Sequence, residues 1–317
     1  MTVRIIEYSY PGEKPNTENL AVALGYFDGV HLGHRKLIAT LVDEAKKNNL
    51  TPCIFTFGNS LSKIKNTQTI LYNTEEKLSI FEEMGIEVVI VSDFASISSL
   101  TPEDFVNKVL VNDLSVKLCA VGYNFRFGKK ASGDANDLKR LMEANGCSAI
   151  CIDEETVFGN AVSSTIIRSL LAEKRVEDAN ALLGIPYFIR GVVERGLGLG
   201  KHFGFPTVNT PLRGDSPLAF GVYRTAVRIG DELFTGITNI GSCPTVKERE
   251  AHAETLIADF SGDLYGKEIR IYLLEYLREE RKFDSIEELK AQIHQDRDLS
   301  KIKNGDLKWL EIGLNLQ

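Results

Sequence analysis

Two histidines three positions apart, His31 and His34, have the type and spacing that could serve chemistry on a phosphate. They end the segment Gly25–His34, which follows an apolar run and opens a helical pattern. A helix N-terminus at that place offers unpaired N–H groups and a positive potential to a phosphate. The two imidazoles could donate to triphosphate oxygens, and Gly33 would let the backbone approach closely. This placement favours nucleotide binding over two unrelated surface histidines or over a zinc site, for which no third ligand lies nearby.

Two later segments could serve the same ligand. Ser163 to Thr165 can cap a helix, and Arg168 in that helix presents a planar fork of donors that suits a polyphosphate. The segment Gly122–Gly128 contains Asn124 and is followed by Gly133-Asp134. Taken alone, the first is equally an ordinary cap with a solvated arginine, and the second is equally a plain turn.

Together these segments resemble the H-x-G-H nucleotidyltransferase superfamily and, more closely, the bacterial bifunctional riboflavin kinase/FAD synthetase family. The matching patterns are H-x-G-H, G-x-[DN]-F-x-F-G…G-D and S-S-T-x-[IV]-R. The resemblance implies a Rossmann-like domain that transfers AMP from ATP to FMN, giving FAD and pyrophosphate, with His31 and His34 as catalytic residues. It implies these nucleotide-binding residues: Gly25, Phe27, Asp28, Gly29, His31, Gly33, His34, Asn124, Ser164 and Arg168.

The second half of the chain carries an independent match. Gly191–Lys201 resembles the opening of a riboflavin kinase domain, and Gly204–Asn209 resembles its G-F-P-T-A-N motif. The glycine run is not a Walker A loop, because its spacing is one residue short and no Ser or Thr follows Lys201. Thr207 and Asn209 are two residues apart, so in an extended chain both face the same side. Their oxygens are hard donors that suit Mg²⁺ and ATP phosphates.

The resemblance implies an antiparallel β-barrel that phosphorylates riboflavin with ATP, giving FMN and ADP. Glu254 is the implied base for the ribityl hydroxyl, although a strand carboxylate facing water would show the same pattern. Thr207 and Asn209 are the implied Mg²⁺ ligands. The implied nucleotide- or flavin-binding residues are Gly196, Gly198, Gly200, Lys201, Pro206, Thr207, Asn209, Asn239 and Arg278.

The chain departs from the family at one place that concerns function. After Phe55-Thr56-Phe57 the family usually has Pro-His-Pro, whereas this chain has Gly58-Asn59-Ser60. We expect this change to affect the flavin pocket or the efficiency of the first domain rather than its nucleotide site. This change leaves open a kinase with a weakened adenylyltransferase. Two further alternatives are independent of it: a flavin-binding regulatory protein without turnover, and a first domain acting on another mononucleotide, such as nicotinamide mononucleotide.

Alternating strand and helix patterns predict a parallel α/β sheet in the first half. The predicted strands lie at 20–27, 53–57, 87–91, 117–122 and 148–152, and the predicted helices lie at 74–84, from 101 and at 135–145. Thr74 and Thr101 are the expected caps, and Gly85 is the expected stop. From Ile189 onward, β-rich runs at 189–194, 220–229, 232–237, 254–260 and 268–276 predict an antiparallel barrel or sandwich. A helix capped by Ser285 closes the chain. We expect domains at 1–184 and 185–317.

Composition narrows the class of protein. The 317 residues are 43% hydrophobic and 26% charged, with 37 Lys and Arg against 44 Asp and Glu, a net charge of −7. That balance opposes non-specific binding to nucleic acid or to an anionic membrane. No apolar run approaches the roughly 18 residues of a membrane span, and the start of the chain lacks a signal peptide's apolar core. Five cysteines without a metal spacing suggest reduced thiols. We expect a cytoplasmic, monomeric enzyme that acts on small-molecule substrates.

Overall fold

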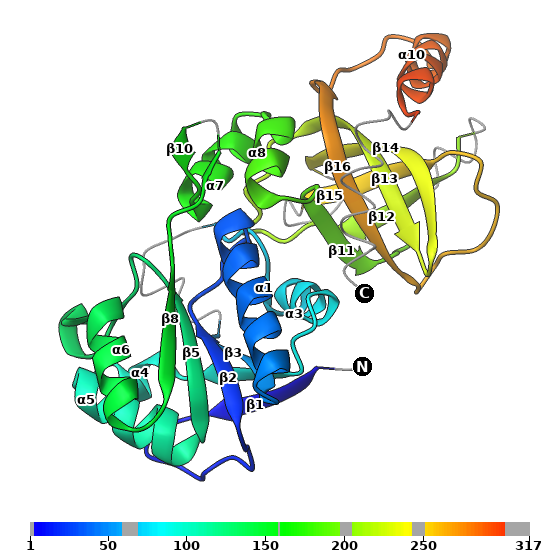
Figure 1. Cartoon of the computed structure of the whole chain (residues 1–317). Coiled ribbons are helices and arrows are strands. Elements are labelled where there is room, and N and C mark those ends of the chain that lie inside the picture. The colour runs from blue at the N-terminus through cyan, green and yellow to red at the C-terminus, as the bar shows by residue number, and fades with distance from the viewer. Residues whose placement is uncertain (1–2, 59–68, 158, 197–204, 243–250, 302–317) are drawn as a thin grey trace. The chain divides into compact units, whose positions relative to one another are not determined.

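A computed structural model describes residues 3–58, 69–157, 159–196, 205–242 and 251–301. The chain divides into two compact units, one ending at Ser164 and the other beginning at Thr165. Both units can be followed in Figure 1, and each is described by itself below.

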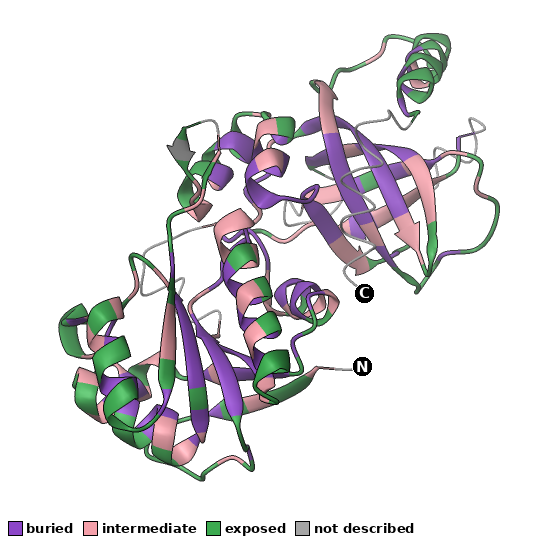
Figure 2. Cartoon of the chain, viewed as in Figure 1, coloured by how far each residue is buried: buried purple, intermediate pink, exposed green. Residues whose placement is uncertain are grey.

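The first unit is built on a six-stranded sheet in which every neighbouring pair is parallel. Its order is β1-β4-β3-β2-β5-β8. The strands are β1 (Arg4–Tyr8), β2 (Leu20–Leu24), β3 (Thr51–Phe57), β4 (Val88–Ser92), β5 (Val116–Gly122) and β8 (Ser148–Ile152). All five residues of β2 are buried, as the purple central strands in Figure 2 illustrate. The expected Rossmann-like domain is confirmed.

Helices and short elements complete this unit. The helices are α1 (Leu32–Lys47), α3 (Thr74–Glu83), α4 (Phe94–Ile97), α5 (Pro102–Asp104), a π-helical turn (Phe105–Asp113), a 3₁₀ turn (Lys129–Ala131) and α6 (Ala135–Ala144). The small strands are β6 (Arg126–Phe127), β7 (Gly133–Asp134), β9 (Thr156–Val157) and β10 (Asn160–Ala161). Helix α1 buries one apolar face, formed by Leu37, Ile38, Leu41, Val42 and Ala45.

The ends of the helices test the expected caps. The Ser285 and Thr101 side chains cap their helices as expected, accepting hydrogen bonds from the N–H groups of Glu288 and Asp104. Thr74, in contrast, is the wrong residue for the cap of α3. Asn73 accepts from the N–H of Glu76, whose carboxylate accepts from the N–H of Asn73 at 2.7 Å. This reciprocal pair satisfies two helix-end donors at once, so the helix begins one residue earlier than a cap at Thr74 would place it.

The second unit contains an antiparallel six-stranded sheet of order β11-β16-β13-β14-β15-β12. Its strands are β11 (Phe188–Val192), β12 (Thr207–Pro211), β13 (Gly221–Ile229), β14 (Glu232–Ser242), β15 (Ala251–Ile257) and β16 (Glu268–Arg278). The N–H of Glu194 donates to the carbonyl of Asn209 at 2.8 Å. This bridge joins the two edges of the sheet, so the strands close into the expected barrel-like form, and helix α10 (Ile286–Leu299) follows.

Two helices precede the barrel: α7 (Ser164–Ala172) and α8 (Val176–Leu183). Asn180 of α8 is buried, donates to the carbonyl of Leu273 at 2.9 Å and accepts from the N–H of Tyr187 at 2.7 Å. Helix α8 is therefore fastened to barrel strand β16 and to Tyr187, the residue just before β11. The domain boundary at 184/185 stays a prediction, since division by contacts places both helices with the second unit from Thr165 onward.

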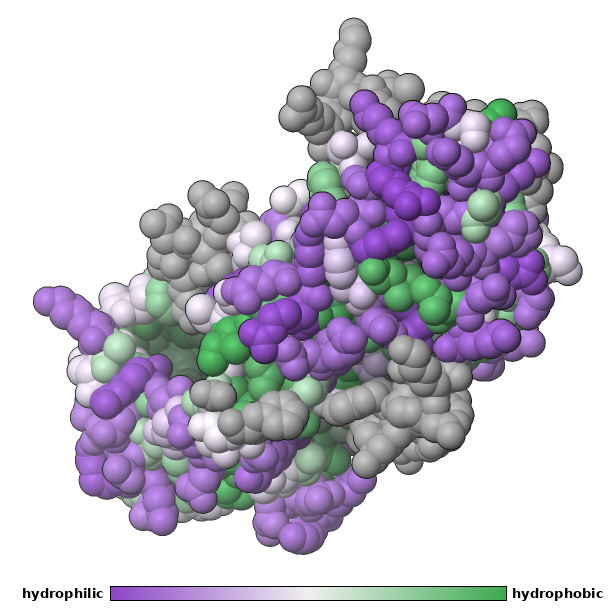
Figure 3. All heavy atoms as spheres, turned by 90° about the horizontal axis from the view of Figure 1, so that it is seen from above, coloured by the Kyte–Doolittle hydropathy of each residue, from purple (hydrophilic) through white to green (hydrophobic). Residues whose placement is uncertain are grey.

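The surface is mixed in polarity. Hydrophilic residues cover most of the face in Figure 3, with smaller hydrophobic areas between them. The exposed large hydrophobic residues belong to different elements, among them Ile5 of β1, Tyr123 after β5 and Leu299 of α10. Within the described ranges, no helix has the length and apolar character to cross a membrane. Cys53, Cys119 and Cys147 are buried free thiols and Cys151 is an exposed one; Cys243 lies outside the described residues.

Candidate functional site

The histidine segment follows β2, the strand at which the order of strand connections in the parallel sheet reverses. Strand β2 has β3 on one side and β5 on the other, so the chain fills one half of the sheet before it returns to β5. Ligands of open α/β sheets bind at the carboxyl ends of the strands beside such a switch point. The loop after β2 carries His31, and the loop after β5 carries Asn124. Topology alone therefore directs both loops to one edge.

The loop between β2 and α1 has an unusual backbone. Phe27 and Val30 are buried and have left-handed φ angles of 54° and 43°. Such angles are strained for side chains with a Cβ, and most of all for a β-branched valine. Gly29 has φ of 80°, and a Cβ there would meet Leu71 Cδ1 at 2.4 Å, so only glycine fits. The surrounding structure holds this loop in a conformation that it would not adopt alone.

The two histidines meet at the start of α1. Their rings stack with centroids 3.8 Å apart and planes inclined by 18°, and the Phe27 ring meets His34 edge-on at 5.1 Å. His31 is 8% exposed, and its Nδ1 has no hydrogen-bond partner among the described residues. Burial lowers the pKa of His31 to about 4. At neutral pH its imidazole is therefore uncharged and keeps one donor nitrogen and one acceptor nitrogen.

The beginning of α1 suits an anion. His31 is the N-cap residue, yet its side chain makes no capping hydrogen bond, and the first turn holds no acidic residue. A Cβ built on Gly33 would be 3.4 Å from His31 Cε1 and 3.7 Å from Glu155 Cβ, which are ordinary contacts. The fold therefore does not demand glycine at position 33. Its absent side chain instead keeps the helix start open, and the helix dipole there favours negative charge.

The remaining residues expected in the adenylyl site differ in their contacts and exposure. The Ser164 hydroxyl donates to the carbonyl of Asp28 at 2.6 Å, and both residues belong to the first unit. The Asp28 carboxylate accepts from the N–H of Leu71 at 3.0 Å. Asn124 is exposed after β5. Arg168 lies on α7 in the second unit, where its Nη2 donates to Thr165 Oγ1 at 3.2 Å. Gly25 donates its N–H to the carbonyl of Phe55 at 3.2 Å.

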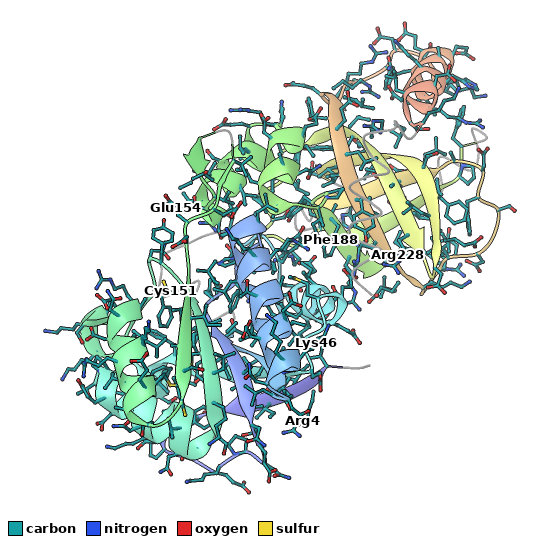
Figure 4. The ribbon with its side chains drawn as sticks, viewed as in Figure 1. Arg4, Lys46, Cys151, Glu154, Phe188 and Arg228 are labelled. Carbon is teal, nitrogen blue, oxygen red and sulfur yellow. The ribbon has the colours of Figure 1, made fainter. Side chains whose placement is uncertain are left out.

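Sequence reasoning overlooked residues that support this edge. Lys77 of α3 is buried, and its Nζ donates to the carbonyl of Tyr26 at 3.4 Å. The hydroxyl of Tyr123, next to Asn124, donates to Glu154, which follows β8 and is labelled in Figure 4. The signal for Lys77 was available: it shares a helix face with Ile80 and Phe81, where an apolar residue is the rule. No sequence pattern indicated Glu154, because its partner Tyr123 is 31 residues away along the chain.

In the second unit, polar side chains form one row across three strands. Asn209 of β12 and Asn239 of β14 are both direct partners of Glu254 on the intervening strand β15. Direct antiparallel partners point to the same face of a sheet. The Thr207 hydroxyl donates to Glu254 Oε1 at 2.7 Å. Thr207, Asn209, Asn239 and Glu254 therefore lie together on the outer face, opposite the interior residues Ala253 and Thr255, which are fully buried.

The glycine loop begins on this row. A Cβ on Gly196 would lie 2.1 Å from Asn209 Nδ2, so the loop backbone passes directly over the Asn209 amide. No residue except glycine could hold that position without moving Asn209. Gly198, Gly200 and Lys201, which are also expected in the site, lie outside the described residues. Pro206 is exposed beside Thr207.

The donor set of the row fits a hard cation. Asn239 Nδ2 donates to Glu280 Oε1 at 2.9 Å, while the buried Asn239 Oδ1 has no hydrogen-bond partner in the described part of the chain. A buried acceptor left unmatched costs free energy unless a ligand, ion or water satisfies it. Hydroxyl, amide and carboxylate oxygens are the ligands that Mg²⁺ prefers. The residues present therefore suit Mg²⁺ and a polyphosphate.

Arg278 is engaged at the other end of the row. Its guanidinium binds the buried Asp296 of α10 through two hydrogen bonds, at 3.2 and 2.7 Å. Gln292 Nε2 also donates to Asp296, at 2.7 Å. The structure thus uses Arg278 to fasten α10 to β16, and a role in ligand binding stays a prediction. Phe205, just before Pro206, meets His294 of the same helix edge-on at 5.0 Å.

Comparison with known proteins agrees with this geometry in both units. A family model described as FAD synthetase matches residues 13–166, and one described as riboflavin kinase matches residues 183–302. The crystal structure of a macrolide-efflux protein from Streptococcus pneumoniae matches with a TM-score of 0.81 and 28% identity, over 94% of this chain and 99% of that protein.

Curated relatives match along most of the chain. The bifunctional riboflavin kinase/FMN adenylyltransferase of Bacillus subtilis is 35% identical over 286 residues, which is 87% of this chain and 90% of that protein. The protein of the same description from Escherichia coli K12 is 36% identical over 284 residues, covering 88% and 91%. Identity at this level over both units, together with the two model matches, assigns the chain to the bifunctional riboflavin kinase/FMN adenylyltransferase family.

Proposed function

We propose that the second unit phosphorylates riboflavin and that the first unit converts the resulting FMN to FAD. In the first reaction, the ribityl 5′-oxygen attacks the γ-phosphorus of ATP, the hydroxyl proton passes to a base, and ADP leaves. Glu254 is the base, which is supported by its place in the middle of the row and by the Thr207 hydrogen bond that orients its carboxylate. A positioned base of this kind contributes about 10²- to 10⁴-fold to a rate.

Thr207 and Asn209 would hold Mg²⁺ together with the ATP phosphates. When bound, the ion would neutralise charge on the phosphates during phosphoryl transfer, a reaction that depends on positioning and electrostatics. The backbone at Gly196 is fitted to Asn209, so the glycine loop would bring its own N–H groups to the same phosphates. Gly198, Gly200, Lys201 and Pro206 would extend this cradle, and Asn239 would bind through its unmatched oxygen.

In the second reaction, a phosphate oxygen of FMN attacks the α-phosphorus of ATP and pyrophosphate leaves. His31, His34 and the N-terminus of α1 would bind the triphosphate and stabilise charge on the departing pyrophosphate. The lowered pKa of His31 supports a neutral imidazole that acts through hydrogen bonds rather than as a fixed positive charge. Asn124, Ser164 and Arg168 would complete the site. No enzyme nucleophile takes part, because the FMN phosphate attacks directly.

The observation that carries this proposal is the presence of two polar clusters in two different units of one chain. A riboflavin kinase alone would need only the row on β12, β14 and β15, and would have no use for the strained histidine loop. The alternatives are a protein with one live activity and a flavin-binding protein without turnover. We also propose that the enzyme is cytoplasmic and monomeric and that it binds small molecules rather than nucleic acid.

Chromatographic product analysis separates these possibilities. Riboflavin, ATP and Mg²⁺ should yield FMN and then FAD, and FMN with ATP should yield FAD and pyrophosphate. Formation of FMN without FAD would identify a riboflavin kinase alone. The segment Gly58-Asn59-Ser60 would then be the first explanation to test for the missing adenylyltransferase activity. Tight flavin binding without consumption of ATP would establish the regulatory alternative.

A further inference from the structure

Lys77 is a buried cation in the first unit that the mechanism above does not use. It lies on α3, is 3% exposed, and shares its face with the buried Ile80 and Phe81. Its Nζ donates to the Tyr26 carbonyl at 3.4 Å and lies 4.8 Å from the centroid of the Tyr26 ring. Taking an ammonium out of water is costly, so a lysine at an apolar position calls for an explanation.

The position of Lys77 points to the strained histidine loop. The carbonyl that it binds also accepts from the Thr56 hydroxyl of β3 at 3.2 Å. In the segment just before α3, six residues before Lys77, the N–H of Leu71 donates to the Asp28 carboxylate at 3.0 Å. Hydrogen bonds thus hold the loop at Tyr26 and at Asp28, immediately before Gly29 and Val30, which have left-handed φ angles. A turn with such angles keeps its shape only when its surroundings impose it.

We propose that Lys77 is a positioning residue of the adenylyl-transfer site, where its ammonium holds the Tyr26 carbonyl and faces the Asp28 carboxylate, and so sets His31 and the start of α1. The inference rests on the adenylyl-transfer activity proposed above. Lys77 touches no reacting atom in this arrangement. It acts through the loop at Tyr26, which lies five residues before His31.

The titration of Lys77 gives the proposal a distinctive signature. Burial lowers its pKa to about 8, against the raising effect of Asp28. Asp28 is the charged group that faces it from the loop, the Tyr26 phenol is titratable, and Thr56 on β3 is uncharged. Below pH 8 the ammonium is charged and holds the loop. Above pH 8 it loses its proton, so formation of FAD from FMN should decline.

The effect of replacing Lys77 on thermal stability distinguishes a positioning role from a purely structural one. Because the pKa of Lys77 is lower in the folded protein than in the unfolded chain, charging it opposes folding at pH 7. Methionine has a similar length without the charge. The substitution Lys77→Met should therefore leave the thermal unfolding temperature at pH 7 unchanged or raise it, whereas loss of a purely structural brace would lower it.

The experiment uses the full chain and measures both activities on each preparation. Lys77→Met should lower kcat/KM for FAD formation from FMN by tenfold or more and leave the rate of riboflavin phosphorylation unchanged. Lys46→Met is the matched control, because Lys46 is exposed on the last turn of α1 in the same unit (Figure 4). In a double-mutant cycle with Thr56→Val, the two losses should not add, since both side chains act on one carbonyl.

Three results would overturn the proposal. The first is FAD formation by Lys77→Met at the wild-type rate, and the second is a loss that only follows a fall in unfolding temperature. The third needs no variant and applies even if Lys77→Met fails to fold: a wild-type pH profile for FAD formation without a decline near pH 8. A wild-type protein that forms no FAD would overturn the proposed function as well, and is thereby distinguished from the other outcomes.

Discussion

Single residues show how burial sets chemical roles in this protein. His31 is almost fully buried, with its ring stacked on that of His34, and desolvation keeps its imidazole neutral near pH 7. A neutral ring can offer one N–H donor to a triphosphate and needs no counter-charge while the site is empty. Glu254 differs from His31 in that its side chain is exposed, on the outer face of β15.

The first prediction concerns the imidazoles. His31→Ala or His34→Ala should lower FAD formation from FMN by about 10²-fold or more, the usual loss when a donor to developing charge is removed. Riboflavin phosphorylation should change little, because the kinase residues lie in the other unit. The measurement is the pair of rates on one preparation. Equal loss of both activities would indicate misfolding or a shared site, and would contradict two separate sites.

The second prediction concerns the base. Glu254→Gln keeps an oxygen that can accept the Thr207 hydroxyl but removes the proton acceptor, so FMN formation should fall about 10²- to 10⁴-fold. Calorimetry should still detect riboflavin binding, and FAD formation from supplied FMN should persist. Phosphorylation at the wild-type rate would remove Glu254 from the mechanism and make it an ordinary strand carboxylate.

At this scale the sequence revealed residues in contiguous motifs and missed those that arrive from elsewhere. His31, His34, Thr207 and Asn209 stand at fixed spacings within motifs, so their types, spacing and placement together suggested a role. Lys77 reaches Tyr26 across 51 positions, and only the folded chain brings them together. The direct pairing of Asn239 with Glu254 likewise depends on strand register, which short sequence patterns do not specify.

Among the elements, the loop and the start of α1 allow two glycines to be compared: Gly29, which the fold requires, and Gly33, for which we propose a role in ligand binding. Gly33→Ala should fold normally and even stabilise the helix by up to about 1 kcal/mol, because alanine is the better helix former. The added methyl would occupy the open helix start, so KM for ATP in FAD formation should rise. Thermal unfolding and ATP titrations measure the two effects. An unchanged KM would show that the phosphates do not approach position 33.

Gly29→Ala is the contrasting variant for that comparison. Its φ of 80° and the 2.4 Å approach to Leu71 make any side chain costly, so this change should lower the unfolding temperature. A Gly29→Ala protein as stable as the wild type would mean that the loop can relax, and would weaken the argument that the fold imposes its shape.

Elements were predictable where hydrophobic periodicity was strong. Apart from β1 and β12, the strands of both sheets lie where apolar runs predicted them, with ends shifted by a few residues, and helix α6 was predicted likewise. Strand β1 escaped notice because its exposed Arg4 and Ile5 give an edge strand little apolar signal. Strand β12 escaped because Thr207–Pro211 holds proline and polar residues, and it was identified only by its motif.

For the whole molecule, the division of the chain raises a question about helices α7 and α8. The family models end at 166 and begin at 183, so residues 167–182 belong to neither match. Asn180, however, bonds to both Leu273 and Tyr187 in the barrel. A fragment that begins at 185 would leave the buried carbonyl of Leu273 and the N–H of Tyr187 unmatched.

The fourth prediction follows from that bond pattern. A fragment beginning at Thr165 should unfold at a higher temperature than one beginning at 185, with both ending at 317. Riboflavin phosphorylation by each fragment provides the functional comparison. Equal unfolding temperatures would support the boundary at 184/185, and would mean that α8 is an accessory to the barrel.

The hydrogen bond from the N–H of Glu194 to the carbonyl of Asn209 closes the barrel, so the exchange rate of that amide proton should report ligand binding. One residue both closes the sheet with its backbone carbonyl and presents its amide side chain to the proposed magnesium nucleotide. Whatever immobilises the Asn209 side chain should also slow the opening of that closure. The amide proton of Glu194 should therefore exchange with deuterium several-fold more slowly in saturating Mg-ATP, while amides in the middle of β13 should not change. Hydrogen exchange at one peptide group would then report occupancy of the kinase site during turnover, without any label on the substrate.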